Sequence, residues 1–365
     1  MIGFARLRLR VLTAAAVAAL VPLTAIAAST AVEPAAGPPA VEPDGSPSAV
    51  HVLPELSLGP ESSRALQGAA MTDRSTASLV LDKKGDYRAL PDVPGALQTT
   101  HVRNNNRGQV VGTYAVNDGG TVRLRGFLMR SRHLTRIDMP GAVATVPLGI
   151  NDHGQVVGSW VGPDATVNPV TGELNPVHGF HWDRGKFRTF DIPGSTSTAA
   201  YEINNRGEIV GNYTDGNDVQ HGYILAKGRV TTIDHPRATD APNLTATRVV
   251  GINDRGQLVG SYGDDRGIIR AWAWKRGRFI TIHPRFGLQS EASQIDNHGR
   301  IVGRYIDPDL RSFLLERGKY TRIDVPNRCD TAALDINDRG QILIAAAGTT
   351  DGTTCPPAAA LTTRR

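Results

Sequence analysis

The chain of 365 residues carries 40 Lys and Arg against 35 Asp and Glu, a formal net charge of +5. Three of the cations, Arg6, Arg8 and Arg10, lie at the extreme N-terminus, so the remainder of the chain is close to neutral. The composition therefore argues against a specific nucleic-acid partner, and the placement of the charges matters more than their sum.

The first 27 residues have the pattern of a secretory signal peptide. The three arginines precede an apolar run, Val11–Ala27, that ends in small residues. A retained membrane anchor is the alternative, but the run contains Pro22 and is shorter than the roughly 20 residues that a span needs. We predict a secreted, extracellular protein with no transmembrane segment after signal removal.

Two regions follow the signal peptide. Residues 28–75 are rich in Pro, Ala, Gly and Ser, which predicts a mostly disordered linker. Residues 76–365 are predicted to form one all-β repeat domain, large enough to bury a substantial core.

A hairpin pattern recurs through this domain. The copy at Gly251–Tyr262 has two β-prone runs around Asn253-Asp254-Arg255-Gly256, in which Asn and Asp favour the first turn positions and Gly favours positive φ. Further copies lie at Asn105–Tyr114, Gly149–Trp160, Glu202–Tyr213, Gln294–Tyr305 and Asp335–Ile344. A repeat of 41 to 53 residues built from short β segments is typical of a propeller or an array.

A second hairpin pattern alternates with the first. It is clearest at His178–Gly194, where an aromatic strand, a Gly turn and a strand ending in Asp-x-Pro follow one another. Copies lie at Ala77–Gly95, Arg125–Gly141, His221–Pro236, Arg270–Pro284 and Arg311–Pro326. One hairpin of each kind gives four antiparallel strands, which predicts a β-propeller of four-stranded blades.

The order of the hairpins indicates how the ring closes. The domain begins with the second kind and ends with the first, six of each, so the two ends together complete a composite blade in a six-bladed ring. An open or seven-bladed form that uses Pro356–Thr363 as a further strand is the alternative.

The two cysteines, Cys329 and Cys355, are predicted to form a disulfide, because an even count in an exported chain favours a bridge. Two free buried thiols are the alternative.

The alternation of Gly-Ile-Asn-Asp-x-Gly-x-Val-Val-Gly with His178-Gly179-Phe180 resembles the HAF-repeat family of probable extracellular bacterial proteins. The family is named for His-Ala-Phe, and here Gly replaces Ala, while Arg125, Arg270 and Arg311 replace His in other copies. The resemblance implies secretion and a β-repeat fold, and it implies no activity.

No motif for catalysis is found, so catalytic residues stay unassigned. The chain lacks His-Glu-x-x-His, Gly-x-Ser-x-Gly and phosphate-loop patterns. His178 and His181 lie three apart on a predicted strand, hence on opposite faces, and make a poor metal pair.

Charges sort onto two faces of the predicted disc. Loops between second and third strands place acids on one face: Asp215, Asp218, Asp264, Asp265, Asp307 and Asp309. The remaining turns place cations on the other: Arg255, Arg276, Arg278 and Arg317. The acids predict at most a weak calcium site and no other cofactor, and turn chemistry with solubilising charge is the simpler interpretation.

We therefore predict a secreted binding or scaffold module for an extracellular protein, glycan or anionic envelope polymer, without a defined catalytic activity. An extracellular propeller lyase or hydrolase and a structural envelope repeat are the alternatives. An enzyme would need unlike polar residues converging at the channel mouth or at the Val161–Pro176 insertion.

Overall fold

The computed structural model describes residues 77–118, 121–131, 133–167, 174–239, 246–284, 289–307, 309–325, 328 and 330–347. The predicted signal peptide and linker, both cysteines and Pro356–Thr363 lie outside these residues. Within the described part of the chain, no helix is long and apolar enough to cross a membrane.

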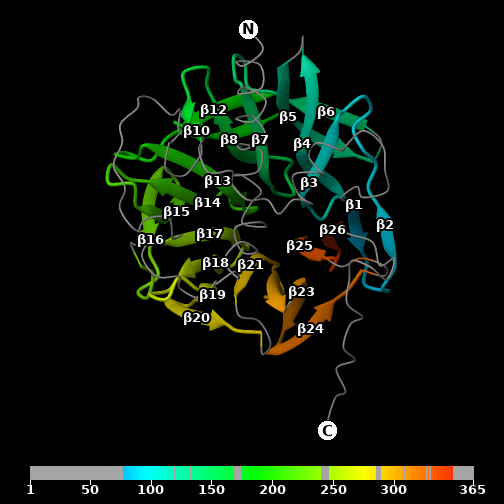
Figure 1. Cartoon of the computed structure of the whole chain (residues 1–365), viewed down its shortest axis with the longest axis vertical. Helices are drawn as coiled ribbons and strands as arrows, with labels where there is room; N and C mark the ends of the chain where they lie inside the picture. Colours follow the sequence, from blue (N-terminus) through cyan, green and yellow to red (C-terminus); the bar gives the residue numbers. More distant parts are fainter. Residues whose placement is uncertain are drawn as a thin grey trace, which may run out of the picture.

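The described residues form six four-stranded antiparallel units arranged as a ring (Figure 1). The first two comprise β3 (Gln98–Asn104), β4 (Gln109–Asp118), β5 (Thr121–Arg130) and β6 (His133–Ile137), then β7 (Ala144–Ile150), β8 (Val156–Val161), β11 (His178–Asp183) and β12 (Lys186–Phe190). The third and fourth comprise β13 (Ser197–Ile203), β14 (Ile209–Thr214), β15 (Gln220–Ala226) and β16 (Arg229–Ile233), then β17 (Thr247–Ile252), β18 (Leu258–Gly263), β19 (Ile269–Lys275) and β20 (Arg278–Ile282). The fifth comprises β21 (Ser290–Ile295), β22 (Ile301–Asp307), β23 (Asp309–Glu316) and β24 (Lys319–Ile323).

The sixth sheet joins the two ends of the domain. Its order is β2-β1-β26-β25, so β25 (Asp330–Ile336) and β26 (Ile342–Ala347) supply the inner strands, and β1 (Ala77–Leu81) and β2 (Tyr87–Ala89) supply the outer ones. Strands β1 and β26 pair from Ala77 with Ala346 to Leu81 with Ile342. The predicted composite sheet is confirmed, and Figure 1 shows the first and last strands of the domain side by side.

The insertion between β8 and β11 adds a small hairpin, β9 (Thr166–Val167) with β10 (Leu174–Asn175). It makes a separate two-stranded sheet and does not interrupt the second four-stranded unit. A single parallel bridge, Leu124 with Ala144, links that unit to the first.

Each first hairpin turns as its sequence predicts. Asn253 Oδ1 accepts bonds from the backbone N–H of Arg255 and Gln257, both at 3.0 Å, and Gly256 has φ of 70°. Every inner strand also contains a bulge five to seven residues before the turn glycine, such as that between Val249 and Gly251. The bulge turns the following side chain toward the middle of the ring.

The hydrophobic core lies between neighbouring sheets. One cluster combines Val259 and Ile282 of the fourth sheet with Ile295, Ile301 and Phe313 of the fifth, all almost fully buried. Glycines let the strands approach, since a Cβ on Gly260 would meet the carbonyl oxygen of Arg248. Each sheet is thus stabilised by its two neighbours, which positions the turns of all sheets in common rings.

Candidate functional site

The six inner strands each direct one residue to the centre of the ring. These residues hold the same place in every repeat, five positions before the turn glycine: Arg103, Gly149, Glu202, Gly251, Gln294 and Asp335. Four are polar and unlike, and all four are almost fully buried. The prediction named converging unlike residues as a sign of function, but did not identify these; their signal is that this position changes in charge and size from one repeat to another.

The four polar side chains form a single network. Arg103 Nε donates to Glu202 Oε2 at 3.0 Å, and Gln294 Nε2 donates to the same oxygen at 2.5 Å. Arg103 Nη1 also donates to the carbonyl of Leu334 at 3.0 Å. Asp335 Oδ2 accepts the backbone N–H of Asn104 at 2.6 Å. Strands that are far apart in the sequence are therefore joined through the centre.

Burial dominates the electrostatics of this network. It raises the pKa of Glu202 above its usual range; the Arg103 guanidinium opposes the rise, and the nearby Asp335 carboxylate adds to it. Burial likewise raises the pKa of Asp335, against the influence of Arg103. The adjoining cavity has a volume of about 70 Å³, well below the roughly 300 Å³ of the smallest usual ligand pockets. The four side chains fill the centre of the ring and leave only this small cavity beside them.

A ring of asparagines at the turns ties each sheet to the next. Asn105 Nδ2 donates to the carbonyl of Asn151 at 2.9 Å, and the same bond recurs from Asn151, Asn204, Asn253 and Asn337. In the fifth sheet Asp296 cannot donate, and there Arg300 bonds Asp296 Oδ2 through Nε at 2.6 Å and the carbonyl of Asn337 through Nη2 at 3.3 Å. The charged pair replaces the Asn–Gln pair of four other repeats and the Asn204–Glu208 pair of the third sheet.

The next residue of each turn forms a second ring in which Asn and Asp alternate: Asn106, Asp152, Asn205, Asp254, Asn297 and Asp338. Asn205 Nδ2 donates to Asp152 Oδ2 at 3.1 Å and to Asp254 Oδ2 at 2.9 Å. Asn106 and Asn297 bridge their flanking aspartates in the same way. Each amide donates both protons and each carboxylate accepts from both sides.

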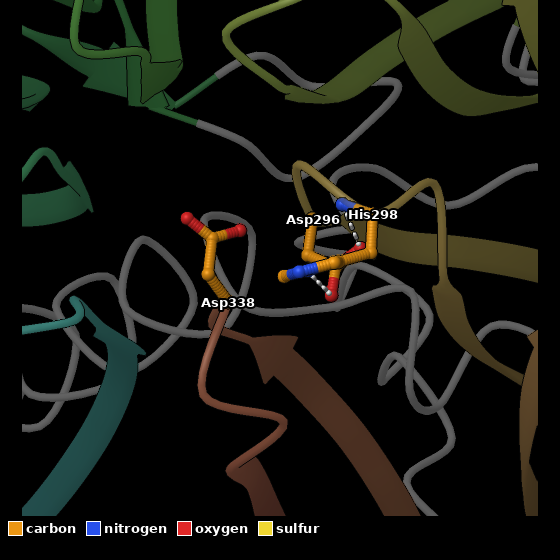
Figure 2. A group of neighbouring side chains, drawn as sticks. All are labelled: Asp296, His298 and Asp338. Atoms are coloured by element: carbon orange, nitrogen blue, oxygen red, sulfur yellow. Dashed lines mark hydrogen bonds and ion pairs between the residues drawn. The ribbon is translucent and has the colours of Figure 1, made fainter.

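Asp296, His298 and Asp338 are the one group within the described residues whose ligand atoms lie close enough to hold a metal (Figure 2). Asp296 is already paired with Arg300 at 2.5 Å, and Asp338 accepts amide protons from Asn297 and Asn106. His298 is exposed and adds one weak contact to Asp296 at 3.6 Å. These carboxylates are neutralised or hydrogen-bonded by the protein itself, so the group is a poor cation site.

The predicted acidic-face residues lie in separate loops rather than in one cluster. Asp215 Oδ1 accepts the backbone N–H of Asn217 and Val219, and Asp264 Oδ1 accepts those of Arg266 and Ile268. These bonds lower the pKa of Asp215, and they help to lower that of Asp264 against the effect of its burial. Asp218, Asp265 and Asp307 are exposed, and Asp309 begins β23.

The predicted basic-face residues are all exposed: Arg255, Arg276, Arg278 and Arg317. Arg255 belongs to a turn between first and second strands, and the other three belong to or flank turns between third and fourth strands. In an antiparallel sheet these two kinds of turn lie at the same end. A Cβ added to Gly299, in the β21–β22 turn, would lie 3.9 Å from Nζ of Lys275, which precedes the β19–β20 turn. The two kinds of turn are therefore close together. We call this side the turn face.

The histidines of the second hairpin form regular pairs with the Asp of Asp-x-Pro. His178 Nδ1 lies 2.9 Å from Asp191 Oδ2 and stacks on Trp160 at 4.8 Å between ring centroids. His221 Nδ1 lies 3.0 Å from Asp234 Oδ2 and stacks on Tyr213. These contacts recur between repeats, which marks them as structural.

Comparison with known proteins agrees with this architecture. No family model and no curated protein matches the chain. A putative TolB from Agrobacterium tumefaciens superimposes with a TM-score of 0.51 at 10% identity, over 76% of this chain and 100% of that one. The β-propeller domain of the Trilobed protease from Pyrococcus furiosus gives a TM-score of 0.44 at 12% identity, over 71% and 79% of the two chains.

The Aleuria aurantia lectin gives a TM-score of 0.39 at 14% identity, over 71% of this chain and 90% of the lectin. At sequence identities this low, the similarity shows a shared fold and nothing about function. The chain is therefore an all-β protein of the β-propeller fold.

Proposed function

We propose that this protein is a secreted binding or scaffold module of the HAF-repeat kind, whose turn face binds an anionic extracellular polymer. The localisation rests on the N-terminal sequence pattern, and the partner chemistry rests on the turn face. The buried centre of the ring supports a binding role over an enzymatic one, because its carboxyl groups adjoin only a small cavity.

One observation carries the proposal. In four of the six sheets the turn between third and fourth strands holds a cation at positive φ: Arg184 at 48°, Lys227 at 51°, Arg276 at 52° and Arg317 at 50°, each followed by Gly; in the first sheet Ser131 holds this position at 55°. Asn, Asp or Gly suits this position, whereas a long side chain in the left-handed region costs roughly 1–2 kcal/mol. Repeated use of Arg and Lys at a strained position indicates that the charge there serves a purpose beyond folding.

The cations of the turn face are also free to act. Arg255, Arg276, Arg278 and Arg317 have no ion-pair partner among the described residues, in contrast to Arg206, which pairs with Glu208 at 2.6 Å. Guanidinium groups with open donors recognise phosphate and other oxyanions bidentately.

Charge reversal tests the proposal. We expect the mature protein to be retained on phosphocellulose at low salt and released as salt rises, because exposed charges are screened beyond about 8 Å at physiological ionic strength. Changing Arg255, Arg276 and Arg278 to Glu should abolish retention.

The matched control reverses three exposed arginines on outermost strands, Arg88 of β2, Arg136 of β6 and Arg188 of β12, and so changes the net charge equally. It should remain bound. Equal elution of both triple variants would show that net charge alone drives retention, and elution of both with the parent would show that the turn face binds no anion.

A further inference from the structure

A depression of about 940 Å³ lies beside the fourth sheet, on the side opposite the turn face. Three segments supply its polar walls: the chain after β16 with Arg237 and Thr239, the β18–β19 loop with Asp265 and Arg266, and the end of β20 with Thr281 and His283. This volume is in the range of pockets that enclose a small organic ligand.

The depression lies where the repeat departs from its own pattern. In the second sheet the imidazole of His178, at the start of β11, pairs with the carboxylate of Asp191, which directly follows β12. In the fourth sheet Arg270 stands at the histidine position and His283 at the aspartate position, so that pair cannot form. Arg270 turns instead to the loop, where its Nε donates to Asp264 Oδ2 at 2.8 Å.

The floor of the depression is fixed by packing. Tyr262 is buried and stacks on His235, with ring centroids 3.7 Å apart and planes 11° from parallel. Asp264 Oδ1 holds the backbone of Arg266 at 3.1 Å while its other oxygen holds Arg270. The walls are therefore positioned before a ligand arrives, which lowers the cost of binding.

The charge of the lining suits a ligand with a single negative charge. Arg270 and Asp264 neutralise each other, whereas Arg237 and Arg266 have no ion-pair partner among the described residues. The exposed Asp265 offsets one of these two cations. The remaining excess of one positive charge matches a carboxylate, and a phosphate dianion would face the Asp265 carboxylate without full compensation.

We propose that this depression binds an acidic saccharide, a sugar bearing a carboxylate such as a uronic acid. Arg237, after β16, and Arg266, in the β18–β19 loop, recognise the carboxylate through their planar donors. Thr281 and Asp265 bond the sugar hydroxyls, since one offers a donor and acceptor and the other accepts only.

Calorimetric titration of the mature protein tests the site with three probes of similar size. Galacturonate, with its single carboxylate, is expected to bind, its methyl ester to bind at least about tenfold more weakly, and a galactose phosphate to bind no better than the ester. Equal affinity for acid and ester would show that the carboxylate is not recognised, and tighter binding of the phosphate would overturn the assigned ligand class.

Variants locate the binding. Changing Arg237 and Arg266 to Gln should weaken galacturonate binding at least about tenfold with an unchanged melting temperature, whereas Arg188→Gln on the outer edge of the second sheet should not weaken it. The turn-face triple variant should keep its affinity for galacturonate, which separates this site from the polymer-binding proposal. Unchanged affinity in the Arg237 and Arg266 variant would place the ligand elsewhere and refute the site.

Discussion

At the scale of single residues, the turn glycines have the conformation that the sequence predicts. Gly256 has φ of 70°, and an added Cβ there meets only the flexible end of Arg206 at 3.0 Å. Backbone conformation, rather than crowding, is therefore what excludes other residues.

We expect Gly256→Val to lower the free energy of unfolding by roughly 1–2 kcal/mol, because a β-branched residue is strained at positive φ. Urea denaturation measures the change. Gly216→Ala is the control, since Gly216 has open space around it and no positive φ. Equal midpoints for the two variants would refute the assigned strain.

Buried His101 gives stability a dependence on pH. Burial lowers the pKa of its imidazole to about 4, against the smaller opposing effects of the Asp92 carboxylate and the Pro91 backbone, and the ring packs edge-on against Phe127 at 5.4 Å. Between about pH 6.5 and pH 4 this histidine is protonated in the unfolded chain, where its pKa is near 6.5, and neutral in the folded chain.

The free energy of unfolding should therefore fall as pH decreases from about 6.5 to 4, by on the order of 3 kcal/mol from this residue. Denaturant titrations of the parent and of His101→Leu, compared across that range, isolate the contribution. The variant should lose stability less steeply, and parallel curves would contradict the assignment.

At the scale of elements, the turns of the six sheets act as one hydrogen-bonded belt. Replacing Asp254 by Asn would leave the amides of Asn205 and Asn297 facing an amide in place of a carboxylate. We expect a loss of about 1–3 kcal/mol in the free energy of unfolding, since bonds to a charged acceptor are lost. Thermal denaturation measures it, and Asp183→Asn on the outer part of the second sheet should change little.

The sequence predicts hairpins better than it predicts contacts between them. Asn253 and Gly256 determine their turn through local backbone bonds, so one copy suffices to predict it. The pairing of Arg103 with Glu202 depends on two strands meeting across a closed ring, and nothing near either residue encodes it.

Two departures from the repeat can nonetheless be recognised in the sequence. Asp296 with Arg300 replaces the usual Asn and Gln four residues apart, and His283 replaces the Asp of Asp-x-Pro. Both mark places where the structure is unlike the other sheets. What could not be predicted is their result, an ion pair within the belt and a depression beside the fourth sheet, because each depends on neighbouring segments.

At the scale of the whole molecule, closure depends on β1 pairing with β26. Deleting residues 335–365 removes β26 and leaves Ala77–Leu81 as an unpaired edge, while also removing Asp335 from the centre. Most of the domain's stability should be lost. Thermal denaturation followed by circular dichroism tests this, and a melting temperature within a few degrees of the full domain would show that the composite sheet does not hold the ring closed.

The alternating ring of Asn and Asp has a consequence for how such a protein can evolve. Asn106 meets Asp338 across the seam between chain ends, so the alternation closes without two like residues in contact. Gain or loss of one repeat would bring two carboxylates or two amides together at some junction. Repeats of this kind are therefore expected to be duplicated or lost in pairs during evolution, so that the number of repeats in the ring stays even.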